Sequence, residues 1–395
     1  SAGNIVPDGT YTYQVYATDR AGNYTERNID RITLDTSVTK LFVTTDTDKL
    51  SPNGDGVYEK ITFSTIVTRR EGLERWSLEL IDGSGTIQRR FGGENEIPTK
   101  IEWNGRNEDG NYYESEYKAR FTAEYRKGNR PSVESLPFTL DVSAPRTRID
   151  ISPVPFSPDN DGVDDELSIE IGVSDSNEID RWSFIIFDAE RSGADPANAP
   201  RFKVFSGTGQ PASEILWDGR SDGGELVYAA MDYPYRFEVR DTFGNVAVES
   251  GKIPIDVLVI REGNLLKIKI ANINFKPNTA DYVDDDPEIT ARNEYVLDRL
   301  AEILKKYRQY SITIQGHANV TRFWDPALAE EEQREELLPL SEQRARKVMD
   351  SLIDRNISRD RLSAEGVGGS QPLVPFDDAD NRWKNRRVEF ILEKE

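Results

Sequence analysis

An acid-rich turn near the middle of the chain carries the side chains best suited to binding a metal. It reads Asp159-Asn160-Asp161-Gly162-Val163-Asp164-Asp165-Glu166. Several carboxylates on one tight loop suit a hard cation such as calcium. The spacing differs from that of an EF-hand, and the related turn Asn53-Gly54-Asp55-Gly56 has fewer acids. A plain turn is therefore favoured and no metal site is predicted, with calcium left open as the alternative.

The residue types also restrict catalytic chemistry. His317 is the only histidine and cysteine is absent, so no His-based metal site, catalytic triad or thiolate centre can be assembled. Neither a glycine-rich phosphate loop nor a nucleophile elbow is present in the sequence. The chain has 71 Asp and Glu residues, so the pairing of carboxylates is uninformative. We predict that the protein is not an enzyme and needs no cofactor.

The last 130 residues show strand and helix patterns in alternation. Residues 296–307 have an apolar helical face, and Ser341 is a good N-cap for a second helix. The inner face of that second helix is expected to be Ala345, Val348, Met349, Leu352 and Ile353. The expected strands are 266–270, 273–275, 311–316, 362–366 and 388–392.

Three motifs follow one another across these elements. They are Gly316-His317-Ala318-Asn319, Leu340-Ser341-Glu342-Gln343-Arg344-Ala345 and Asn385-Arg386-Arg387-Val388-Glu389. In this order they resemble the OmpA-like peptidoglycan-binding domain of bacterial envelope proteins, over roughly residues 264–395. The resemblance implies an α+β sandwich.

The resemblance also implies a binding site for the diamino acid of the peptidoglycan stem. An Asp at the position of Asn319 would take the ammonium, and Arg344 would take the carboxylate through a planar guanidinium. Arg386 would line the same pocket, and Arg387 would pair with nearby acids. Asn319 departs from the family, because an amide carries no charge to balance an ammonium.

A long insertion separates Asn319 from Leu340 and is rich in glutamate, including residues 330–332 and 335–336. It is interpreted either as a solvated acidic helix face or as a lid that restores a carboxylate to the pocket.

The first two thirds of the chain contain a repeat. Ser51-Pro52-Asn53-Gly54-Asp55-Gly56-Val57 returns at residues 157–163, and Arg75-Trp76-Ser77 returns at residues 181–183. Short alternating segments between Gly, Asn, Asp and Pro turns predict antiparallel β-sandwiches similar to bacterial Ig-like modules. Trp76 and Trp182 are expected to be equivalent and buried.

These patterns divide the chain into four parts. Residues 1–37 are the tail of a truncated repeat and are expected to pair with the next module or with upstream strands. Residues 38–143 and 144–258 are the two sandwiches, and residues 259–395 are the OmpA-like domain.

Composition narrows the partners. The net charge of −21 disfavours nucleic acid and anionic lipid, and no apolar run is long enough to span a bilayer. We predict a non-enzymatic periplasmic protein of the cell envelope or outer membrane, in which Ig-like spacers carry a domain that contacts peptidoglycan or nearby components. The alternative is a scaffold that has lost peptidoglycan binding and contacts other envelope proteins.

Overall fold

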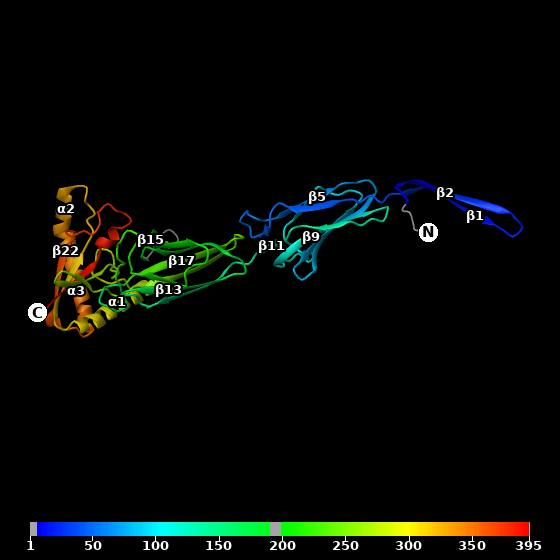
Figure 1. The fold of residues 1–395 in the computed structure, drawn as a ribbon. Coiled ribbons are helices and arrows are strands. Elements are labelled where there is room, and N and C mark those ends of the chain that lie inside the picture. The colour runs from blue at the N-terminus through cyan, green and yellow to red at the C-terminus, as the bar shows by residue number, and fades with distance from the viewer. Residues whose placement is uncertain (1–5, 190–198, 395) are drawn as a thin grey trace. The chain divides into compact units, whose positions relative to one another are not determined.

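The computed structural model describes residues 6–189 and 199–394 and shows several β-sheet regions followed by an α+β domain (Figure 1). The chain divides into two compact units. The first contains residues 1–144 and 242–245, and the second contains residues 145–241 and 246–395. Among the described residues, no helix has the length and apolar character needed to cross a membrane.

The first unit opens with a hairpin of β1 (Gly9–Thr18) and β2 (Tyr24–Leu34). Among the described residues these two strands pair with each other and with no further strand, from Gly9 opposite Leu34 to Thr18 opposite Tyr24. The Asp19 carboxylate closes the turn by accepting hydrogen bonds from the Ala21 and Asn23 amides. The prediction that this stretch pairs with the next module is therefore wrong for the described residues, whereas pairing with upstream strands stays a prediction.

Two sheets make up the rest of this unit and share one apolar core, with Phe63 on one sheet and Phe121 on the other. One has the order β3-β5-β8, and the other has the order β4-β11-β9-β6-β7 with β10 beside β9. The strands are β3 (Leu41–Thr45), β4 (Lys49–Leu50), β5 (Ile61–Val67), β6 (Leu73–Asp82), β7 (Ile87–Glu94), β8 (Lys100–Trp103), β9 (Ser115–Tyr125), β10 (Ser132–Glu134) and β11 (Phe138–Leu140).

The second unit begins with a similar pair of sheets, β12-β13-β16 and β15-β14-β17-β18, around a core that includes Phe184 and Trp217. We refer to this pair as the second sandwich. Its strands are β12 (Arg146–Ser152), β13 (Leu167–Ser174), β14 (Ile179–Phe187), β15 (Arg201–Thr208), β16 (Glu214–Trp217), β17 (Asp232–Asp241) and β18 (Val246–Pro254).

The repeated tryptophans occupy equivalent positions in the two cores. Trp76 lies opposite Gly93 and Trp182 lies opposite Gly207, and each indole covers its glycine so closely that a Cβ there would lie 2.9 or 3.0 Å from the ring nitrogen. Trp76 is buried as predicted, whereas Trp182 is only partly buried. The prediction that Trp182 is buried is wrong, because the residue packs against the core without being enclosed by it.

The C-terminal domain has a five-stranded sheet in the order β19-β20-β23-β21-β22. Helices α1 and α3 carry apolar faces that share a core with this sheet, including Leu300, Val348 and Phe390 (Figure 1). The strands are β19 (Ile260–Glu262), β20 (Leu265–Ile270), β21 (Tyr310–His317), β22 (Leu362–Gly368) and β23 (Val388–Lys394). The helices are α1 (Pro287–Lys306), α2 (Pro326–Glu332) and α3 (Leu338–Asp354), with 3-10 turns at Arg359–Arg361 and Arg382–Asn385.

Two local predictions fail in this domain. Residues 273–275 form no strand; Phe275 makes only an isolated bridge to Tyr282. Ser341 is not an N-cap, because α2 runs through a π-helical turn (Gln333–Leu337) directly into α3. The N-cap is Asp325, whose carboxylate accepts hydrogen bonds from the Ala327 and Leu328 amides.

Candidate functional site

A cavity of about 1110 Å³ lies in the second unit, beside the ends of β21 and β23. Its wall includes Asn319, Arg344 and Arg386, the three site residues predicted from the sequence. Asn319 follows β21, Arg344 lies in α3, and Arg386 lies between the 3-10 turn Arg382–Asn385 and β23. Three segments far apart in the sequence therefore contribute to one cavity.

The Asn319 amide is buried and bonded on both sides. Its oxygen accepts a hydrogen bond from Asn385 Nδ2 at 2.8 Å, and its nitrogen donates to the Val320 carbonyl at 2.9 Å. Asn385 is fully buried and also accepts hydrogen bonds from the Leu373 and Val374 amides. Asn385 therefore connects Asn319 to the loop that precedes β23.

Arg344 is held by the loop between β20 and α1. Its Nε donates to the Thr279 carbonyl at 2.9 Å and one Nη donates to the Lys276 carbonyl at 3.3 Å, while the guanidinium lies 5.0 Å from the centre of the Phe275 ring. These contacts leave part of the guanidinium fork for a further acceptor, since the group has five N–H donors. Burial, together with the neighbouring Arg386 guanidinium, lowers the pKa of Arg344.

Arg382 and Arg386 extend this positive region along the cavity wall. Burial and the Arg382 charge lower the pKa of Arg386. Within the described part of the chain, Arg344, Arg382 and Arg386 form no ion pair with a carboxylate. Like charges gathered without counter-ions fit an anionic ligand.

The insertion between Asn319 and Leu340 adds two acidic residues to the cavity wall, Glu332 and Glu336. Glu332 is buried and accepts hydrogen bonds from the Thr321 amide, the Thr321 hydroxyl and the Arg322 amide. Glu336 pairs with Arg322 at 2.8 Å. The insertion is therefore a fixed part of the wall and not a wholly solvated helix face.

His317 ends β21 and also lines the cavity. It is buried, and within the described residues neither ring nitrogen has a hydrogen-bond partner. Burial, with a contribution from the Arg387 charge, lowers the pKa of His317 to about 4. Arg387 itself pairs with Glu389 at 2.6 Å, as expected of a residue near acids.

The low pKa of His317 predicts a measurable dependence of stability on pH. Unfolded chains protonate this histidine near pH 6.5, whereas the folded protein does so only near pH 4. The unfolded state binds more protons between these values, so stability should fall by up to roughly 3 kcal/mol as the pH drops from 6.5 to 4. A His317→Asn variant should lose this part of the dependence in urea titrations.

The same prediction has a direct spectroscopic check. His317 is the only histidine, so its ring gives one proton resonance that can be followed by NMR without assignment. A titration midpoint near 4 is expected, and a midpoint near 6.5 would contradict the burial argument.

The acid-rich turn lies away from this cavity. Asp159, Asp161 and Asp165 bring carboxylate oxygens within 4.8 Å of one another. Asp165 accepts hydrogen bonds from the Asn160 and Gly162 amides. In the other copy Glu59 accepts from the Gly54 and Gly56 amides in the same way. Asp165 and Glu59 therefore each close their own turn by accepting hydrogen bonds from its backbone amides.

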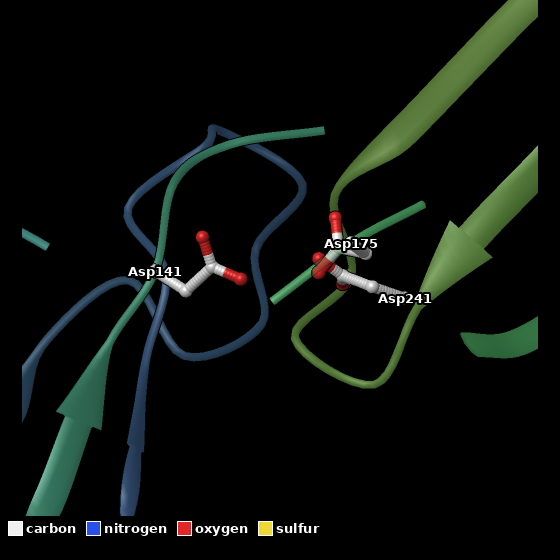
Figure 2. Close-up of side chains that lie close together, drawn as sticks. All are labelled: Asp141, Asp175 and Asp241. Atoms are coloured by element: carbon white, nitrogen blue, oxygen red, sulfur yellow. The ribbon is translucent and has the colours of Figure 1, made fainter. Parts of the chain in front are cut away.

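Figure 2 shows three further aspartates, Asp141 in the first unit and Asp175 and Asp241 in the second. The Asp141 carboxylate accepts a hydrogen bond from the Ser143 amide, and Asp175 accepts one from the Asn177 amide. Asp175 and Asp241 lie with carboxylate oxygens within 4.8 Å of each other. Asp141 and Asp175 thus close turns of their own units.

The sequence motifs located part of the cavity and missed the rest. Glu332 gave no separate signal, because it stands in a run of glutamates whose members look alike. Arg382 was missed because it precedes the last motif, although the basic run Arg382-Trp383-Lys384 was visible. Met231 comes from the second sandwich, which sequence patterns did not connect with the site.

Comparison with known proteins agrees with the geometry of the C-terminal domain. The model of the OmpA family matches residues 282–386. The C-terminal domain is an OmpA family domain. Members of this family are non-enzymatic, in agreement with the prediction that this protein is not an enzyme.

Individual relatives match the OmpA family domain over part of their length. The peptidoglycan-associated lipoprotein of Rhizobium meliloti is 32% identical over 122 residues, which cover 30% of this chain and 64% of the relative. Motility protein B of Helicobacter pylori is 29% identical over 133 residues, covering 34% and 47%. The chain thus spans about half to two thirds of these relatives.

A solved structure, the periplasmic domain of Helicobacter pylori MotB, is also similar. It has a TM-score of 0.28 and 23% identity, and the match covers 35% of this chain and 78% of that one.

Proposed function

We propose that the OmpA family domain binds the peptide stem of peptidoglycan in the cavity described above. The observation that carries the proposal is the convergence of Asn319, Arg344 and Arg386 on one cavity whose guanidiniums have no carboxylate partner within the described residues. A stem peptide offers carboxylates to these guanidiniums and an amine to the acidic side of the wall. The names of relatives such as the peptidoglycan-associated lipoprotein support the same ligand.

The β-sheet regions before this domain are proposed to be Ig-like modules, divided at residues 37, 143 and 258. They support a structural role in the periplasm, at the cell envelope or outer membrane. Their strands bury conventional apolar cores, and Trp103 and Trp217 lie inside them with their indole N–H groups bonded to the Arg106 and Arg220 carbonyls. Such tryptophans support the fold and are not available to stack on sugars.

Co-sedimentation with purified peptidoglycan sacculi tests the proposed function. The full chain should pellet with sacculi, and free stem peptide should release it. A chain that remains in the supernatant at every protein concentration would refute the proposal.

The second candidate function is an interaction scaffold for other envelope proteins. It is favoured by Asn319, whose amide is uncharged and already bonded to Asn385 and Val320. Absence of sacculus binding, together with capture of a specific envelope protein through the same cavity, would support this alternative.

Asn319→Asp is expected to strengthen binding of a stem peptide with a free side-chain amine by about tenfold, because a carboxylate balances the ammonium and a charge-assisted hydrogen bond is stronger than a neutral one. Asn385 Nδ2 is already placed to support the new carboxylate. Calorimetry should show the gain, and the same peptide with an acetylated amine should show none. Equal gains for both peptides would contradict the assigned role.

A further inference from the structure

The 3-10 turn Arg382–Asn385 lies between the cavity and the second sandwich. Arg382 and Trp383 line the cavity, while Lys384 points the other way and is buried. The Lys384 ammonium lies 3.0 Å from Glu225 Oε1 and 4.8 Å from the centre of the Tyr228 ring. The Trp383 ring meets Tyr228 edge to face at 5.3 Å. One short turn therefore connects a cavity wall to a neighbouring module.

Glu225, Tyr228 and Lys384 form a hydrogen-bonded network. The Tyr228 hydroxyl donates to Glu225 Oε1 at 2.7 Å, beside the Lys384 ammonium. Burial raises the pKa of Tyr228, so the hydroxyl keeps its proton and acts as a donor at neutral pH. Although burial alone would raise it, the bonds from Tyr228 and Lys384 hold the pKa of Glu225 below its usual value. At neutral pH the carboxylate is thus charged opposite a buried ammonium.

Further contacts fix the second sandwich against the OmpA family domain. Arg299 in α1 donates two hydrogen bonds to the Asp256 carboxylate, at 2.8 and 2.6 Å. Asn272 Nδ2 donates to the Ala230 carbonyl at 2.8 Å. Ala230 and Val257 also belong to the apolar core of the OmpA family domain. The second sandwich and the OmpA family domain are thus joined by a shared apolar core and a bidentate ion pair.

We infer that the second sandwich helps to shape the ligand site. Glu225 and Tyr228 hold Lys384, and Lys384 fixes the 3-10 turn that places Arg382 and Arg386 on the cavity wall. The sandwich also contributes Met231 to that wall directly. This inference rests on the proposed function for the identity of the ligand. Glu225 and Tyr228 are not among the residues that line the cavity, so they are positioning residues.

Removing Glu225 tests the inference in the full chain. Glu225→Ala leaves the buried Lys384 ammonium without its carboxylate, so the 3-10 turn should shift and affinity for the stem peptide should fall about fivefold or more, the usual size of coupling between linked sites. The matched control is Glu170→Ala, an exposed residue on β13 of the same sandwich, which should bind normally. The exchanged pair Glu225→Lys with Lys384→Glu should recover most of the affinity.

A double-mutant cycle separates positioning from general loss of structure. If Glu225 acts through the guanidiniums, Glu225→Ala should cause little further loss in an Arg386→Ala background. Equal losses in both backgrounds, or unchanged affinity in the single variant, would overturn the inference.

Amide hydrogen exchange gives a test that needs no ligand. The Arg386 amide donates to the Trp383 carbonyl at 3.0 Å, so its exchange reports the integrity of the turn. Glu225→Ala should accelerate exchange over residues 382–386, and Glu170→Ala should not. Unchanged exchange would overturn the inference, whereas faster exchange in a protein that binds no stem peptide would leave it standing and refute the proposed function instead.

Discussion

Arg344→Ala should reduce the affinity for a stem peptide by about 100-fold. The carboxylate of the peptide would be desolvated without a charged partner, which costs roughly 2–3 kcal/mol or more of binding free energy. Arg344 is already oriented by the Thr279 carbonyl and the Phe275 ring, so little entropy is lost when a carboxylate binds. Arg344→Lys should bind with intermediate affinity, because an ammonium keeps the charge but cannot form two parallel hydrogen bonds. Calorimetry on the full chain measures all three proteins.

Arg346→Ala is the matched control for this experiment. Arg346 lies on the same helix, is exposed and pairs with Glu342 one turn away, its one ionic partner among the described residues. Its removal should leave binding unchanged. Equal affinity of the Arg344→Ala and Arg346→Ala variants would eliminate the cavity as the binding site.

Gly316→Ala should destabilise the OmpA family domain by at least about 3 kcal/mol, as expected of overpacking against rigid backbone. An added Cβ at Gly316 would lie 2.1 Å from the Ser341 carbonyl oxygen in α3. A Cβ at Gly366 on the neighbouring strand would also lie too close to the helix, 2.4 Å from the Leu338 carbonyl oxygen. The helix would have to move away from the sheet, which would break the 3.0 Å bond from the Gly368 amide to Ser341 Oγ.

Urea denaturation followed by the fluorescence of the C-terminal tryptophans measures this effect. Gly172→Ala serves as the control, because Gly172 also lies in a strand but a Cβ there would meet its nearest atoms at 3.6 and 3.8 Å. It should change stability by less than about 1 kcal/mol. Similar urea midpoints for the Gly316→Ala and Gly172→Ala variants would contradict the prediction, because they would show that α3 moves away from the sheet at little cost in free energy.

The sequence predicted most of the C-terminal fold, because its apolar periods are regular. Val296, Leu297, Leu300 and Leu304 were placed on one face of a helix, and all four are buried. The motifs also brought Asn319, Arg344 and Arg386 to neighbouring elements, which line one cavity. Regular apolar periods and short motifs indicate which side of an element faces the core, so these features could be predicted from the sequence.

Features that depend on packing between elements could not be predicted from the sequence. Ser341 has the composition of an N-cap, but the preceding insertion continues the helix and converts it into an interior residue that bonds to the Leu338 carbonyl. Glu332 and Glu331 look identical in sequence, yet only Glu332 is buried against Thr321. Trp182 shares its motif with Trp76 but differs in burial, and the repeated sequence around the two residues contains no signal for this difference.

The contact between Trp383 and Tyr228 has an optical consequence. Trp324 is 69% exposed, whereas Trp383 packs against another ring at the junction between module and domain. In a chain with Trp324 replaced by phenylalanine, Trp383 would be the remaining indole of the OmpA family domain. Its emission would then shift to longer wavelength whenever water reached the junction. The change in emission, measured against the four tryptophans of residues 38–258, would therefore report separation of the second sandwich from the domain it contacts.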